Sequence, residues 1–174
     1  DLQNIQILVF RGEALASISP FSQMDVTTCP DYGGKGHYLY ADSGEILKKR
    51  PVGRARGTTI EVRNLFFNVP ARKKFLKKEA AELAEIVNVI GRFGLACCEV
   101  EFRLVHEDRS LLHIPVSASR IDRIRAVLGP DVADNVIDIE GRGPSCDVKG
   151  FVSRPAYSRR DRKAQMFFVN SRAV

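Results

Sequence analysis

The stretch GTTIEVRNLFFNVPARKKFL, residues 57–76, changes character half-way along. In its first part the apolar Ile60 and Val62 alternate with polar neighbours, which is the period-two pattern of a half-buried strand. The chain then turns through Asn68-Val69-Pro70, where Asn68 can cap the next segment. We therefore predict a strand that ends in a capped turn. The four apolar residues Phe66, Phe67, Phe75 and Leu76 are expected to serve the core, and the neighbouring lysines and arginines to form a basic surface.

Before this stretch, turn residues at 33–34 and 42–44 separate short strand patterns that end at Thr28 and cover 38–40, which predicts a strand meander. After it, a run that begins at Glu79 predicts a helix that ends near two glycines. Its apolar residues have helical spacing, at Leu83, Ile86, Val87 and Ile90, and the glycines are Gly91 and Gly94.

In the second half of the sequence, alternating residues at 100–104 and 111–116 predict a hairpin. Ser119 and Asp122 resemble a capping box at the start of a short amphipathic helix that Gly129-Pro130 stops. Further strands are predicted at 135–139, 147–153 and 165–169. The fold class is therefore α/β, as an α+β arrangement of two layers, with a domain boundary near residues 115–120.

The composition is that of a globular protein, with 44% hydrophobic and 28% charged residues among 174, and a net charge of +6. The basic excess lies in the tail, where residues 149–174 contain seven basic residues and the single acid Asp161. Such asymmetry suits an anionic partner, nucleic acid above all, and equally suits a solvated face. No stretch has the length of a membrane span or a signal peptide, so we expect an intracellular protein.

The four cysteines form no C-x-x-C pair, and the three histidines have no metal-ligand spacing with them, so no metal site is expected. Both ends of the sequence lack the polar fringe that usually frames a domain, and we expect an internal fragment of a longer protein.

The stretch FRGEALASIS, residues 10–19, places Gly12 directly before a helix-forming run that begins with Glu13 and Ala14. Free amides and the helix dipole at such an end favour an anionic oxygen, and Arg11 adds a positive charge. These physical features alone are weak evidence for phosphate binding, because most junctions of this kind are merely turns.

Three strings together resemble the MutL-type DNA mismatch repair ATPases of the GHKL superfamily. FRGEAL is similar to the family's GFRGEAL motif, and GTTIEVRNLFFNVPARKKFL is similar to its GT and LFxNxPARxKFL motifs. FFVNSRAV is similar to its FVNxR strand. The resemblance covers essentially the whole chain. It implies a lid over the phosphates of ATP and a strand along the floor of the nucleotide pocket. The lid residues would be Phe10, Arg11, Gly12, Glu13 and Ala14, and the floor residues Gly57 and Thr58.

Two positions depart from the family's pattern. Val9 stands where the family has a glycine before the phenylalanine of the lid, and Ser171 replaces the glycine of the FVNxR strand, although Arg172 is retained. The resemblance also implies a DNA groove on the second domain, and the candidate DNA-binding residues are Arg159, Arg160, Arg162, Lys163 and Arg172.

The resemblance implies that residues 1–118 are the lid and the C-terminal half of the GHKL ATPase sandwich. Residues 119–174 would then begin a transducer domain of the ribosomal-protein-like type. It further implies ATP and Mg²⁺ as cofactors, and DNA, a MutS-type mismatch-recognition protein and a second N-terminal region as partners. The location would be cytoplasmic in a bacterium, which is favoured, or nuclear in a eukaryote.

The family's catalytic glutamate and Mg²⁺-binding asparagine have no counterpart in this sequence, so we predict no catalytic residue here and no ATP turnover by these residues alone. The alternative is a non-enzymatic, basic nucleic-acid-binding module in which FRGEAL is only a helix start. A third possibility, another GHKL enzyme, is opposed by the PARKKFL string.

Overall fold

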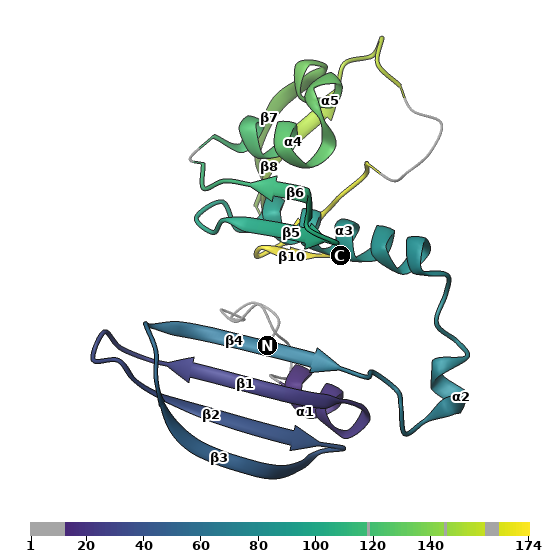
Figure 1. Ribbon diagram of the computed structural model, residues 1–174. Helices are drawn as coiled ribbons and strands as arrows, with labels where there is room; N and C mark the ends of the chain where they lie inside the picture. Colours follow the sequence, from purple (N-terminus) through teal and green to yellow (C-terminus); the bar gives the residue numbers. More distant parts are fainter. Residues whose placement is uncertain (1–12, 118, 145, 159–163) are drawn as a thin grey trace. The chain divides into compact units, whose positions relative to one another are not determined.

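The computed structural model describes residues 13–117, 119–144, 146–158 and 164–174 (Figure 1). Their contacts form two compact units: an N-terminal unit, residues 13–78, and a C-terminal unit that begins at Glu79. The predicted boundary between parts 1–118 and 119–174 concerns the domains of the family and stays a prediction. No helix among the described residues is both long and apolar enough to cross a membrane.

The N-terminal unit is a four-stranded antiparallel sheet with short helices beside it (Figure 1). The strand order is β3-β2-β1-β4, so the predicted meander is present, and β4 returns to pair with β1. The elements are α1 (Ala14–Ile18), the 3₁₀ turn η2 (Ser19–Phe21), β1 (Gln23–Cys29), β2 (Lys35–Asp42), β3 (Glu45–Gly53), β4 (Gly57–Arg63) and α2 (Pro70–Lys73).

Alternate residues of each strand point to opposite faces of this sheet, as a pleated strand requires. One face carries Met24 and Ala41, which are 5% and 2% exposed, and also Ile60 and Val62 of β4, which are 42% and 41% exposed. The other face is polar: the register sets Asp25 of β1 between strands β2 and β4. The strand predicted at residues 58–62 is therefore present with Ile60 and Val62 on one face, but the half-buried pattern expected of it is not seen, because both side chains are exposed.

Two expectations for residues 66–76 are wrong. Three of the four residues expected in the core are exposed: Phe75 by 86%, Leu76 by 43% and Phe67 by 41%. Phe66 is half-buried, with its ring 6.3 Å from that of Phe21. Asn68 does not cap α2. Val69 is the N-cap, and the Asn68 amide donates instead to the carbonyl of Pro20 at 2.8 Å. A four-residue helix that starts with proline needs little capping.

The C-terminal unit is built from one long helix, two short helices and three two-stranded antiparallel pairs (Figure 1). Its elements are α3 (Glu79–Ala96), β5 (Phe102–His106), β6 (Arg109–Ile114), α4 (Arg120–Leu128), α5 (Pro130–Asp134), β7 (Val136–Arg142), β8 (Asp147–Ser153), β9 (Phe168–Val169) and β10 (Arg172–Ala173). The predicted helices and the hairpin are confirmed, and the strand predicted at 165–169 is restricted to its last two residues.

Helix α3 runs past both glycines that were expected to end it. A Cβ atom at Gly94 would lie 2.4 Å from Cδ1 of Ile114, and one at Gly91 would lie 3.0 Å from Cγ1 of Val127. Ile114 is fully buried. The two glycines therefore mark places where α3 approaches β6 and α4 closely.

The most buried polar side chain of this unit is Arg123 of α4, which is 1% exposed. Its guanidinium donates only to backbone carbonyls, those of Gly94, Cys97, Val100, Ile114 and Pro115. Three of these lie at the C-terminal end of α3 or just beyond it, where the helix dipole favours a cation. Arg123 thus joins α4 to the ends of α3 and β6.

The capping box predicted at Ser119 does not form. Ser119 is the N-cap of α4 but makes no side-chain capping bond, and the Asp122 carboxylate accepts a hydrogen bond from the Ser117 hydroxyl at 3.3 Å. Ser117 Oγ also accepts the Ser119 amide at 3.1 Å. The side-chain hydrogen bonds at the start of α4 are therefore made by Ser117, two residues before the N-cap Ser119.

Candidate functional site

Of the predicted lid residues, Phe10, Arg11 and Gly12 lie outside the described residues. Glu13 is the N-cap of α1 and makes no side-chain capping bond, and its carbonyl accepts the Ser17 amide at 2.8 Å. Ala14 is the first residue of α1. The helix expected after Gly12 is thus present, although it has only five residues.

The predicted floor residues Gly57 and Thr58 open strand β4. Gly57 has a φ of +136°, a conformation that side chains rarely adopt, which explains a glycine at this position. The Thr58 hydroxyl lies 2.8 Å from the hydroxyl of Thr28 across the β1–β4 pair. Since one hydroxyl donates to the other, the pair keeps one donor and free lone pairs. Their assignment to a nucleotide site stays a prediction.

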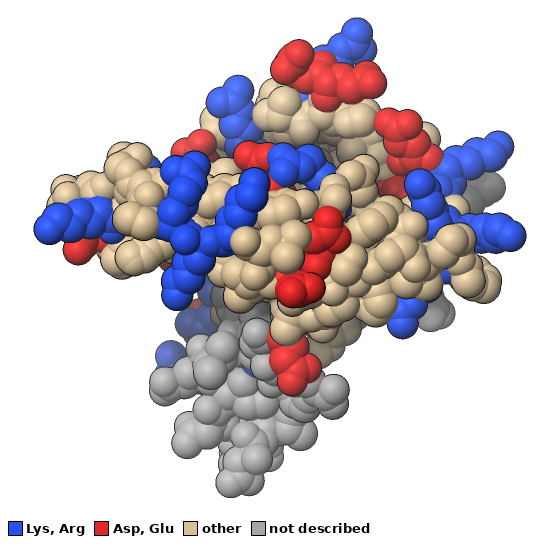
Figure 2. Space-filling view, turned by 60° about the horizontal axis from the view of Figure 1, so that its bottom comes forward, with Lys and Arg blue, Asp and Glu red and all other residues tan. Residues whose placement is uncertain are grey.

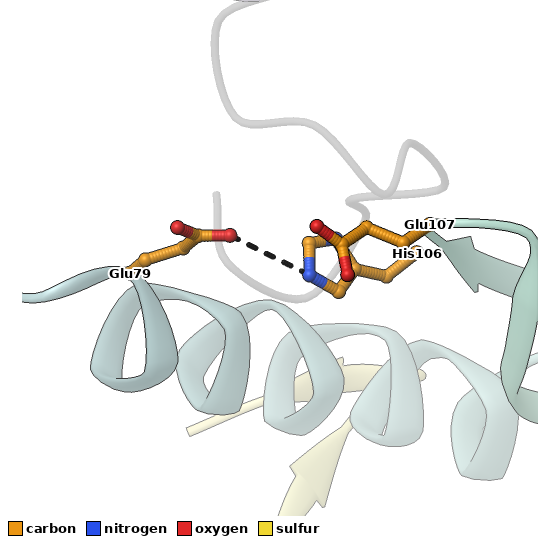
Figure 3. A group of neighbouring side chains, drawn as sticks. All are labelled: Glu79, His106 and Glu107. Atoms are coloured by element: carbon orange, nitrogen blue, oxygen red, sulfur yellow. Dashed lines mark ion pairs between the residues drawn. The ribbon is translucent and has the colours of Figure 1, made fainter.

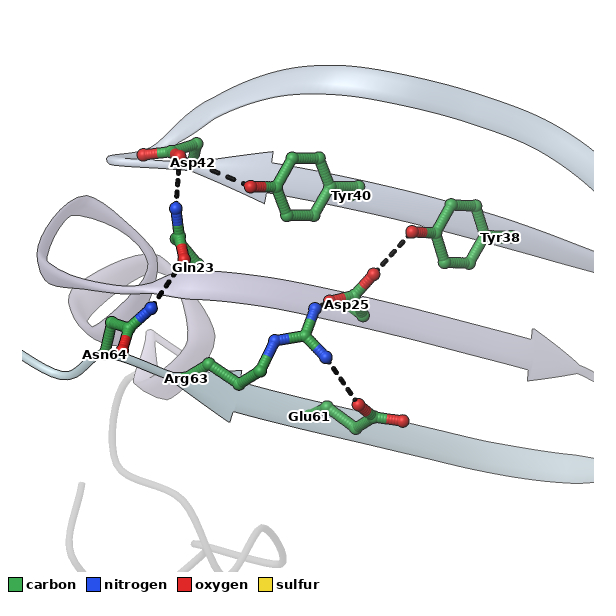
Figure 4. A network of polar contacts seen from close by, with 8 residues as sticks. All are labelled: Gln23, Asp25, Tyr38, Tyr40, Asp42, Glu61, Arg63 and Asn64. Atoms are coloured by element: carbon green, nitrogen blue, oxygen red, sulfur yellow. Dashed lines mark hydrogen bonds and ion pairs between the residues drawn. The ribbon is translucent and has the colours of Figure 1, made fainter.

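The polar face of the sheet holds two neighbouring groups of hydrogen-bonded side chains, one around Asp25 and one around Asp42, which together we call the tyrosine–carboxylate network (Figure 4). The Asp25 carboxylate accepts hydrogen bonds from the Tyr38 hydroxyl and from Arg63, which also donates to Glu61 at 2.9 Å. The Asp42 carboxylate accepts from Gln23 at 2.8 Å and Tyr40 at 3.3 Å. This network was not expected from the sequence, where its only signal is the polar half of the alternation in each strand.

The network shifts the ionisation of its members. Hydrogen bonds from Gln23, the largest cause, and from Ser43 hold the pKa of Asp42 below its usual value, so this carboxylate stays charged. The pKa of Tyr38 is raised above the usual 10.0, mainly by its hydrogen bond to Asp25 and next by burial. Burial is the main cause of the raised pKa of Tyr40.

We expect Asp25→Asn to lower the pKa of Tyr38 towards 10.0 and to leave that of Tyr40 nearly unchanged, because Asp25 is the main cause of the first shift only. A tyrosine whose pKa is higher in the folded than in the unfolded protein stabilises the fold at pH values below its unfolded pKa. That stability is lost as the pH rises through its folded pKa. Absorbance titration of tyrosinate, with Tyr38→Phe to assign the signal, measures both pKa values. Equal shifts of the two tyrosines in Asp25→Asn would contradict this account.

Among the predicted DNA-binding residues, Arg159, Arg160, Arg162 and Lys163 lie outside the described residues. Arg172 is half-buried in β10, which pairs with β9 in a tight hairpin. The turn residues Asn170 and Ser171 have φ values of 49° and 63°. A positive φ at position 171 explains the glycine of the family pattern, and serine holds the same turn at some cost in backbone strain.

One group of possible metal ligands was not expected from the sequence, because its members are not close together along the chain. Glu79 at the start of α3 lies beside His106 and Glu107 at the end of β5 (Figure 3). A carboxylate oxygen of Glu79 is 3.5 Å from Nε2 of His106. Both glutamates are exposed, and this ion pair accounts for the arrangement, so we assign no metal to it.

Comparison with known proteins places these features in a family. The family model "DNA mismatch repair protein, C-terminal domain" matches residues 124–174. The DNA mismatch repair protein MutL of Methanoculleus marisnigri is 39% identical over the whole chain, and that of Symbiobacterium thermophilum is 40% identical. The chain covers 30% and 27% of these two proteins. The chain belongs to the MutL family.

Solved structures of MutL agree with this membership. The ATPase domain of Aquifex aeolicus MutL complexed with ADP is 33% identical, with a TM-score of 0.78 over 93% of this chain and 62% of that one. A second structure, the N-terminal domain of a DNA repair protein, has a TM-score of 0.81 at 24% identity and shows the fold alone. The α/β fold class and the GHKL ATPase resemblance are therefore confirmed.

Proposed function

We propose that the protein containing this chain acts in DNA mismatch repair as an ATP-operated switch. The observation that carries the proposal is the likeness to the MutL ATPase domain complexed with ADP, which extends over 93% of the chain. The relatives matched over the full chain are mismatch repair proteins, although the chain spans less than a third of their length. A non-enzymatic nucleic-acid-binding module is less well supported, since the likeness includes the residues assigned to lid and floor.

In this proposal ATP is held from two sides by residues of this chain. Arg11 and the backbone amides around Gly12, with Phe10, Glu13 and Ala14, would close over the phosphates, where positive charge and free amides favour anionic oxygens. Gly57 and Thr58 would line the floor. ATP would supply the phosphates and Mg²⁺ would neutralise their charge, whereas the family's catalytic glutamate and Mg²⁺-binding asparagine have no counterpart in this sequence.

Closure of the lid would bring two N-terminal regions together as a homodimer or heterodimer, and would change how they engage DNA and a MutS-type mismatch-recognition protein. The residues proposed to contact the DNA backbone are Arg159, Arg160, Arg162, Lys163 and Arg172, because their charges can neutralise phosphates without reading bases. A cytoplasmic location belongs to the same proposal.

The test of this switch uses the intact protein. Arg11→Ala and Gly12→Val are expected to weaken ATP-dependent dimerisation about 10- to 100-fold, since a hydrogen bond to a charged group contributes about 1.5–3 kcal/mol. Light scattering with and without ATP measures the dimer, and the mutation rate of a MutL-deficient bacterium carrying each variant measures repair.

Matched controls are Arg142→Ala, at an exposed position, and Gly141→Val, where an added Cβ would meet no atom within 4 Å. Both controls should dimerise and repair as the unchanged protein does. If Arg11→Ala and Gly12→Val dimerise with ATP as well as the controls, the role of the lid is refuted.

A further inference from the structure

Three basic side chains of the N-terminal unit lie over tyrosine rings. Lys48 and Arg50 of β3 are in register with Tyr40 and Tyr38 of β2, and the cations lie 5.9 and 4.8 Å from the ring centroids. The third, Arg56, precedes β4 and lies 5.2 Å from the ring of Tyr32, whose hydroxyl accepts its hydrogen bond at 3.1 Å. We call Lys48 and Arg50 the cationic edge, because both lie on β3, an edge strand of the sheet. Arg56 lies in the turn before β4, at the opposite edge strand, and is not part of it.

Within the described part of the chain, no carboxylate forms an ion pair with either residue of the cationic edge. The carboxylates of the same sheet face have other partners: Arg63 pairs with Asp25 and Glu61. Residues 45–56 contain five basic residues and the single acid Glu45. Figure 2, in which the β3 side of Figure 1 is turned forward, shows a group of neighbouring Lys and Arg side chains.

The tyrosine rings restrict these side chains without using their hydrogen-bonding capacity. A cation over a ring is held by the ring's electron density, while its N–H groups remain free to donate outward. The tyrosines are themselves held, because the Tyr38 and Tyr40 hydroxyls donate to Asp25 and Asp42. The free energy that ordering of long basic side chains normally costs on binding is therefore reduced.

The charge also indicates the kind of partner. Alternate residues of a strand are about 6.8 Å apart, so Lys48 and Arg50 present a row of positive charges along the sheet edge. Basic side chains on an edge strand oppose pairing with a further strand. A flexible row of negative charges fits such an edge better than an added strand does.

We propose that the cationic edge binds the phosphate backbone of DNA, in addition to the contacts proposed for Arg172 and the other basic residues of the tail. The proposal rests on the proposed function in that the ligand is DNA, but it involves other residues. Binding is independent of base sequence, because the contacts are between cations and phosphates.

The test measures binding of the 174-residue chain to short labelled DNA duplexes by fluorescence anisotropy, between about 50 and about 200 mM salt. Lys48→Glu with Arg50→Glu is expected to weaken binding at least about tenfold at low salt and to reduce the slope of log affinity against log salt by about two units. Arg50→Lys should have little effect, since it keeps the charge.

The matched control is Arg103→Glu with Arg109→Glu, which changes the net charge equally at exposed positions of the C-terminal unit. A much smaller loss in this control supports the cationic edge, whereas an equal loss shows a general charge effect and overturns it. Circular dichroism checks that each variant is folded. If Lys48→Glu with Arg50→Glu is not folded, Lys48→Gln with Arg50→Gln is used in its place.

Arg172→Glu separates this inference from the proposed DNA contacts of the tail. If Arg172→Glu weakens binding and the Lys48/Arg50 variant does not, the tail binds DNA and the cationic edge does not. No binding by the unchanged chain at low salt overturns the inference, and leaves the ATP switch to be judged by dimerisation and repair.

Discussion

Replacement of Arg123 by alanine is expected to lower the free energy of unfolding of the C-terminal unit by about 3–5 kcal/mol. The guanidinium donates to five backbone carbonyls, and with alanine these acceptors lose their partner in a buried site. Each carbonyl left without a partner costs part of its desolvation. Urea unfolding followed by circular dichroism measures the loss, and hydrogen exchange in α3 should show it locally.

Two further variants give this prediction its controls. Arg125→Ala, on the same helix, removes an exposed ion pair with Asp134 and should cost less than about 1 kcal/mol. Arg123→Lys keeps the charge, but its single nitrogen has three donors and cannot reach all the carbonyls, so an intermediate loss is expected. A loss for Arg123→Ala no larger than that for Arg125→Ala would show that Arg123 does not join these elements.

The sequence predicted most elements because their patterns are local. Helix α3, the hairpin β5–β6 and the strands β7 and β8 each follow from a few neighbouring residues with regular spacing and turn signals. Arg123 was missed because its role depends on carbonyls from three other segments. On α4 the sequence favoured an apolar face made by Ile121, Ile124, Val127 and Leu128, and an arginine is ordinarily placed in solvent.

In the candidate site, too, residues that belong to a local motif were predicted, and contacts that depend on the folded sheet were not. Gly57 and Thr58 were identified by a motif, and the structure adds the positive φ of Gly57 and the hydroxyl contact to Thr28. The tyrosine–carboxylate network has no motif, because it needs the register of β1, β2 and β4, which only the folded sheet provides. The assigned roles of the lid residues Arg11 and Gly12 stay predictions.

Replacement of Gly94 by alanine is expected to destabilise the C-terminal unit by about 1–3 kcal/mol, although alanine favours a helix over glycine by about 1 kcal/mol. The added Cβ would lie 2.4 Å from Cδ1 of Ile114, which is fully buried, so the isoleucine or the helix must shift. A shift of α3 would also disturb the 2.7 Å bond from Arg123 to the Gly94 carbonyl. Urea unfolding measures the change.

Ile114→Val tests the cause, because it removes the Cδ1 atom while the other two side-chain atoms lie 3.5 and 3.6 Å from the new Cβ. Alone, Ile114→Val should cost about 0.5–1.5 kcal/mol. In its background Gly94→Ala should become neutral or stabilising, since only the helix preference remains. Gly150→Ala, where no atom lies within 4 Å, is the control and should change little. If the cost of Gly94→Ala is the same with isoleucine and with valine at 114, close packing of α3 against β6 is not the reason for this glycine.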